Sequence, residues 1–224
     1  MLIFHTRRTD YRTCRDARFE LTPSLLRKWP NGDWQFLPNE DRLCKELLIA
    51  HYDEFQGDQY CFDRLVRMQH YGLPTRLLDI SGNPLVALFF ACYRAPEPLA
   101  VDGEVIAFRV SSDKVKYYDS DTASCVANLS NLTYAQKNNI DLKLGIEAFN
   151  ESSVAQKLLH HIKSEKGFFQ ARITLPLTRP AGCTATQRGD RGARQRGSRQ
   201  GSCCASLIPA LRAANRSFQF LRIC

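Results

Sequence analysis

The sequence predicts an α+β fold, a single domain of mixed helices and strands that is followed by a disordered tail rich in arginine and glycine. Between residues 40 and 71, apolar residues recur close to helical spacing, which predicts helices. Residues 103–110 alternate instead and are rich in valine, isoleucine and phenylalanine, as expected of a strand. Because helices and strands do not alternate regularly along the chain, the pattern favours α+β over a doubly wound α/β sheet.

The first forty residues carry few signals of regular structure. Residues 21–27 hold a proline followed by a short apolar stretch, which predicts one helical turn. Residues 29–39 contain two prolines and a glycine and are typical of a loop. Asn39 stands where a helix N-cap is expected, ahead of two acids that suit a helix N-terminus. We expect this first long helix to cover residues 40–56.

Two further helices are predicted at residues 61–71 and from residue 84 onward. Gly72 follows the first of them, at the position where a C-terminal cap favours a positive φ angle. Asn83 is placed to cap the second, whose first residue is a proline. Residues 85–93 are almost wholly apolar, so we expect this helix to be buried on all sides.

A helix at residues 151–163 and a strand at residues 168–175 complete the predicted domain. The remainder, residues 176–224, holds nine arginines, no lysine and one acid, and so carries the whole net charge of +8. Residues 178–206 have almost no aliphatic side chain and cannot bury enough apolar surface to fold. This tail is either an arginine-rich arm or the wrong-frame product of a gene rich in G and C. The absence of lysine favours the second interpretation.

The charge distribution bears on possible partners. Residues 1–175 hold 22 basic and 22 acidic side chains, so the domain itself gives no reason to expect a polyanionic partner. We expect nucleic acid to bind only nonspecifically, through the arginines of the tail.

Composition also predicts the compartment. No apolar run approaches the ~20 residues of a membrane span, so no membrane association is expected. The N-terminus has its apolar residues before its charges, the reverse of a secretory signal. We therefore expect a cytoplasmic protein whose body cysteines are reduced and largely buried. The spacing of its cysteines resembles no zinc site, and no metal is expected.

A cluster of polar residues lies between the second and third predicted helices. Buried polar groups must be paired, so Arg76 requires a carboxylate, and Asp79 is the nearest candidate in the sequence. His70 has two interpretations: a partner of the helix dipole at a helix end, or an acid or base with a pKa near neutrality. The whole cluster consists of Gln69, His70, Thr75, Arg76, Asp79, Ser81 and Asn83.

Residues 69–79, with the sequence QHYGLPTRLLD, resemble the hallmark block of the FRG domain family, and the NPLVALFFA stretch after them resembles the helix that follows it. The family is named for a Phe/Tyr-Arg-Gly motif near the N-terminus. Tyr11 and Arg12 match its first two positions, whereas Thr13 replaces the glycine. The resemblance implies an FRG domain at residues 11–175, preceded by an unmatched lead of ten residues.

The resemblance implies two functions of different classes. The first is a nucleotide-binding domain related to ADP-ribosyltransferases, in which Arg12 would hold a phosphate or ribose of NAD and Ser81 would orient the ribose. The catalytic glutamate of such enzymes has no assigned equivalent here, so catalytic residues are unknown and enzymatic activity stays open. The second is a non-enzymatic module that recognises a ligand or partner. Because the family's members are mainly bacterial, a role in defence or stress would fit either function.

Both functions use one candidate site. Its residues are Arg12, Gln69, His70, Thr75, Arg76, Asp79, Ser81 and Asn83. A cleft shared by Arg12 and Ser81, with His70 at its wall, would favour the nucleotide-binding function. An Arg76–Asp79 pair in the core, together with the absence of such a cleft, would favour the recognition module.

Overall fold

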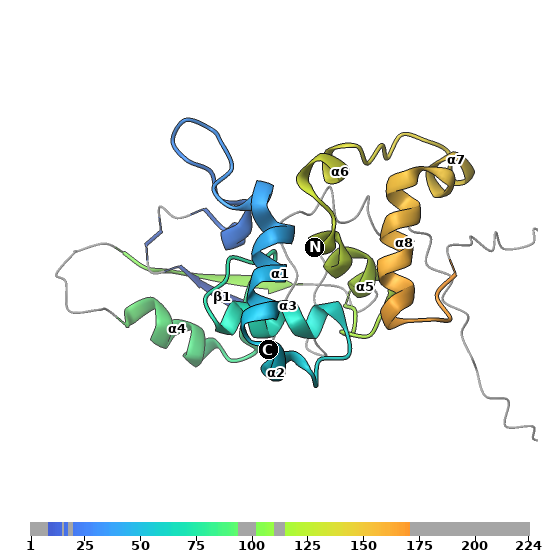
Figure 1. Cartoon of the computed structure of the whole chain (residues 1–224). Helices are drawn as coiled ribbons and strands as arrows, with labels where there is room; N and C mark the ends of the chain where they lie inside the picture. The colour runs from blue at the N-terminus through green and yellow to red at the C-terminus, as the bar shows by residue number, and fades with distance from the viewer. Residues whose placement is uncertain (1–8, 15, 18–19, 94–101, 110–114, 171–224) are drawn as a thin grey trace, which may run out of the picture.

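The computed structural model combines many short helices with a small sheet, so the predicted α+β class is confirmed (Figure 1). It describes residues 9–14, 16–17, 20–93, 102–109 and 115–170. The tail at residues 176–224 lies outside these ranges. None of the described helices is both long and apolar enough to cross a bilayer.

The sheet has two antiparallel strands, β1 (Thr9–Cys14) and β2 (Glu104–Arg109). Cys14 pairs with Glu104 at one end of the ladder. The strand predicted at residues 103–110 is therefore confirmed, whereas β1 had not been predicted from the residue pattern. Its six residues, TDYRTC, are mostly polar, and pairing with a strand about ninety residues away makes them extended.

The first long helix is shorter than predicted. It begins at Glu40 as expected, but α1 (Glu40–Ala50) ends before His51, whose φ of −128° and ψ of 40° are not helical. A separate short helix, α2 (Tyr52–Phe55), follows it. The next helix is α3 (Cys61–His70), and Gly72 after it has the predicted positive φ, +82°. Two 3-10 turns precede α1, η1 (Ser24–Leu26) and η2 (Leu37–Asn39), the first of which was predicted.

The second half of the described chain is helical. The helix predicted at residues 151–163 is divided at Ser152, which ends one helix and caps the next through its side chain. Phe168 lies in a turn, so the strand predicted at 168–175 is wrong at its start; residues 171–175 lie outside the described ranges. The elements are α5 (Asp121–Ala127), η4 (Asn128–Asn131), α6 (Tyr134–Asn138), α7 (Ile146–Glu151) and α8 (Ser153–Glu165).

Two large apolar clusters form most of the core, beside a small one around Ile80. One is built by α1, α2, α3 and α5 around Leu65, and the other by α5, η4, α7 and α8 around Leu158. The halves are also joined by a polar contact, because the Glu165 carboxylate accepts a hydrogen bond from the Cys61 amide at 2.6 Å. That amide lies in the first turn of α3, where backbone donors lack helical partners, so α8 supplies a cap for α3.

The helix α4 (Pro84–Cys92) departs most from expectation. Its start is as predicted, since the Asn83 side chain accepts a hydrogen bond from the Leu85 amide. The prediction of burial on all sides is wrong. Only Ala87 is buried, whereas Leu85 is 71% exposed and Phe89 58% exposed. The reason is geometric: α4 packs mainly against β1 and lies on the other side of the domain from α8 (Figure 1).

We predict that Leu65→Ala will lower the free energy of unfolding by about 2–5 kcal/mol, because the side chain is fully buried in the first cluster. Urea denaturation would measure the change. Ile49→Ala is the matched control: Ile49 is 79% exposed on α1, so its truncation should cost less than about 0.5 kcal/mol. Equal losses in the two variants would contradict the assigned core.

Candidate functional site

Arg12 projects from β1 towards the polar loop that follows α3. Its Nη1 donates a hydrogen bond to the backbone carbonyl of Asp79 at 2.6 Å. Ser81 lies along the edge of β1, because its backbone amide and carbonyl pair with those of Tyr11 at 2.7 and 2.8 Å. The structure thus brings Arg12, Asp79 and Ser81 together at the edge of β1.

The charge of Arg12 is only partly compensated. The side chain is half-buried, and its Nε is buried with no hydrogen-bond partner within the described part of the chain. Burial lowers the pKa of Arg12, and the nearby Asp79 acts in the opposite direction. Its hydrogen-bond acceptor in the described part of the chain, the backbone carbonyl of Asp79, is neutral. A guanidinium in such a setting favours an anion, to which it can donate two parallel hydrogen bonds.

Three of the predicted site residues hydrogen-bond to one another. The side-chain amide of Gln69 donates to the Asp79 carboxylate, with Nε2 2.8 Å from Oδ2. The Thr75 hydroxyl in turn donates to the side-chain oxygen Oε1 of Gln69 at 2.5 Å. The Thr75 hydroxyl also accepts from the Leu77 amide at 3.2 Å. These contacts fix the loop that presents the Asp79 carbonyl to Arg12, so Gln69 and Thr75 act as positioning residues.

The remaining loop residues have separate places. The Ser81 hydroxyl accepts a hydrogen bond from the Asn83 amide at 3.1 Å, while the Asn83 side chain caps α4. Asn83 is therefore structural. His70 is the last residue of α3 and is exposed. This placement is common to both of its interpretations, which stay predictions.

Arg76 is not paired with Asp79, and that prediction is wrong. Its guanidinium donates to Glu40, with Nε 2.9 Å and Nη2 2.6 Å from Oε1, and Nη2 also contacts Oε2. Lys137 of α6 donates to the same carboxylate at 2.5 Å. Arg76 does need a carboxylate, but the fold supplies one from 36 residues earlier in the chain. No local signal identified Glu40 or Lys137 as members of this cluster.

The pKa of Glu40 reflects its two cationic partners. Burial by itself raises the pKa of this carboxyl, but the charges and hydrogen bonds of Arg76 and Lys137 outweigh burial and lower it. Glu40 therefore stays ionised inside the protein. Glu40, Arg76 and Lys137 together join α1, the loop after α3 and α6. We call these three residues the clamp, since their ion pairs hold the three segments together.

Thr13 has a role that the family motif did not suggest. Its hydroxyl donates a hydrogen bond to the carbonyl of Ala87 at 2.6 Å. Ala87 is the buried residue of α4, so this contact fastens the helix to β1. The threonine that replaces the motif's glycine is thus accommodated in the sheet and bonds the neighbouring helix.

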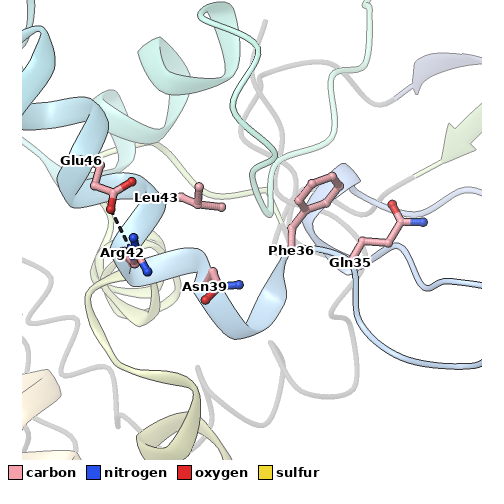
Figure 2. A pocket seen from close by; sticks show the side chains of 6 residues that line it. All are labelled: Gln35, Phe36, Asn39, Arg42, Leu43 and Glu46. Atoms are coloured by element: carbon pink, nitrogen blue, oxygen red, sulfur yellow. Dashed lines mark hydrogen bonds and ion pairs between the residues drawn. The ribbon is translucent and has the colours of Figure 1, made fainter.

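A pocket of about 290 Å³ lies elsewhere, between η2 and the first turns of α1 (Figure 2). None of the predicted site residues lines it. Its two charged side chains, Arg42 and Glu46, form an ion pair with each other at 2.7 Å. The lining consists of Gln35, Phe36, Asn39, Arg42, Leu43 and Glu46.

The cysteines of the described chain offer no reactive thiol in the core. All five are free, and only Cys92 is exposed. Burial raises the pKa of Cys44 to about 12, that of Cys61 to about 11 and that of Cys125 to about 12, which keeps these thiols protonated and inert. Within the described ranges, no group of histidines, cysteines and acids is arranged to hold a metal ion.

The geometry defines an α+β domain in which a strand arginine is held against a polar loop. Residues 7–98 match the family model of the FRG domain, so the chain contains an FRG domain. The match covers β1, α1 to α4 and all eight predicted site residues, and ends before β2. The wider extent of 11–175 stays a prediction. Searches of curated proteins and of solved structures found no significant match.

We predict that Glu40→Gln will lower the free energy of unfolding by about 3–5 kcal/mol, because it leaves Arg76 and Lys137 buried without their anion. Urea denaturation provides the measurement. Glu46→Gln removes a carboxylate from an exposed ion pair on the same helix and should leave the denaturation midpoint nearly unchanged. Equal losses of stability in the two variants would contradict the assignment of Glu40 to a buried ion-pair cluster.

Acid titration supplies a second test of this clamp. The folded protein lowers the pKa of Glu40 below its ordinary value of 4.5, so the stabilisation is complete above that pH and is lost as pH falls through the folded pKa. We expect parent stability to decline below about pH 4.5. The decline should be shallower in Glu40→Gln, whose amide does not titrate. Parallel pH profiles of stability for the two proteins would refute this assignment.

Proposed function

We propose that the FRG domain of this chain binds an anionic nucleotide through Arg12, with NAD as the leading candidate. One observation carries the proposal: the half-buried guanidinium meets a neutral carbonyl instead of a carboxylate, and its Nε lacks a partner among the described residues. A phosphate at this position would offset the charge and satisfy the remaining donors of the guanidinium.

The surroundings of Arg12 suit a nucleotide better than a bare anion. The backbone of Ser81 pairs with that of Tyr11, the neighbour of Arg12, and the Ser81 hydroxyl would exchange its contact with Asn83 for a ribose oxygen when a nucleotide binds. The contacts among Gln69, Thr75 and Asp79 hold the loop in one conformation, which reduces the entropy lost when a ligand binds. An ADP-ribosyltransferase-like reaction would also require a carboxylate at the nicotinamide ribose, and no residue is assigned to that role.

A second candidate is a non-enzymatic module that recognises its ligand through the same arginine. It is favoured by the hydrogen bonds that the side chains of Gln69, Thr75 and Asp79 make to one another. Such contacts are typical of residues that support a loop. The two candidates differ in outcome. Both require binding at Arg12, but only the first leads to release of nicotinamide from bound NAD.

Calorimetric titration of the full chain with NAD, ADP-ribose and ADP should detect binding that is lost in Arg12→Ala. Arg12→Lys should bind weakly, because an ammonium cannot reproduce the two parallel donors. The tail arginines attract phosphates in every variant. The titrations should therefore be run at physiological salt or above, where this nonspecific binding weakens.

Arg42→Ala is the matched control, since Arg42 is an exposed arginine at the pocket beside α1. It should bind nucleotide as the parent does. Absence of binding in the parent, or unchanged affinity in a folded Arg12→Ala protein, would reject the proposal. Loss of binding in Arg42→Ala alone would move the site to that pocket and would also reject it.

A further inference from the structure

The helix α4 exposes a continuous apolar stripe. Leu85, Leu88, Phe89 and Cys92 recur at the i, i+3, i+4, i+7 spacing that places side chains on one helical face, and all four are exposed. Such a stripe normally faces a core or another helix. We propose that α4 is the contact surface of a homodimer, in which the stripes of two copies pack against each other.

The sides of the stripe are apolar as well. Val86, Phe90 and Tyr93 are exposed, and the Phe89 ring contacts those of Phe90 and Tyr93 at centroid distances of 5.5 and 5.3 Å. Residues 84–93 contain no charged side chain. A surface without charge can meet its own copy without like-charge repulsion, and a two-fold axis requires such self-complementarity.

The exposed area agrees with the needs of a dimer. Six large apolar side chains of this helix region are exposed, each by between 39% and 71%. At roughly 100 Å² each, they offer about 600 Å² per copy, or about 1,200 Å² in a dimer, the lower limit for a specific interface. A single patch of about 600 Å² is at the upper end for a monomer, which also indicates a partner.

Charge favours a second copy over the chain's own tail as the occupant. Residues 1–175 are neutral overall, so two domains approach without net repulsion. Residues 178–206 have almost no aliphatic side chain to place against the stripe, and the apolar side chains of residues 207–224 are interspersed with three arginines, whose charges an uncharged stripe would not compensate. The inference is independent of nucleotide binding, because Arg12 plays no part in it.

Sedimentation equilibrium of the full chain, under reducing conditions and from about 1 to about 100 µM, would test the dimer. The parent should approach twice the 25.6 kDa of one chain as concentration rises. Leu88→Glu and Leu85→Glu should each remain at the mass of one chain, because dimerisation would bury a charge. Both positions are exposed in the single chain, so the variants should fold, and circular dichroism would verify it.

Ile49→Glu is the matched control, an exposed apolar residue on α1 outside the stripe, and it should dimerise as the parent does. A parent that stays at the mass of one chain up to about 100 µM would overturn the proposal. So would a dimer that survives both α4 variants, or one that Ile49→Glu abolishes as well. A parent with the mass of one chain whose Leu88→Glu variant melts at lower temperature would show that the chain covers α4 itself, and would equally overturn it.

Discussion

The buried carboxylate of Glu40 is the interaction on which the arrangement of this domain depends. It lies at the first residue of α1 and receives Arg76 from the loop after α3 and Lys137 from α6. Without it, two cationic side chains would stand in the interior with no anion beside them, at a large cost in free energy. The carboxylate therefore determines where the loop crosses the core and docks the C-terminal half against the N-terminal half.

The position of that loop in turn determines the candidate site. Thr75 directly precedes Arg76, and its hydroxyl bonds Gln69, which bonds Asp79. The carbonyl of Asp79 then meets Arg12 on β1. Three polar residues of the family block, Gln69, Thr75 and Asp79, thus hold one another in place. Arg12 differs from them, because its charge is left without a carboxylate contact among the described residues, and the proposed ligand binding rests on this difference.

For the apolar helix α4, the conformation follows from the local sequence, whereas the degree of burial depends on the fold. Its N-cap, its first proline and its helical conformation follow from residues 83 to 92 alone. Its environment does not, since one side is fastened to β1 through Thr13 while most of its surface remains exposed. A helix rich in leucine and phenylalanine favours burial, but it obtains burial only where the fold brings another surface to it.

The sequence by itself determined the α+β class, the caps at Asn83 and Gly72 and the family of the domain, because these depend on neighbouring residues and on a contiguous motif. The tertiary structure decided that Arg76 pairs with Glu40, that β1 pairs with β2 in a sheet, and that α4 is exposed. Each of these depends on groups far apart in the chain. Sequence spacing ranks the nearest carboxylate first, whereas a buried cation pairs with the one that the packed core brings within hydrogen-bond distance.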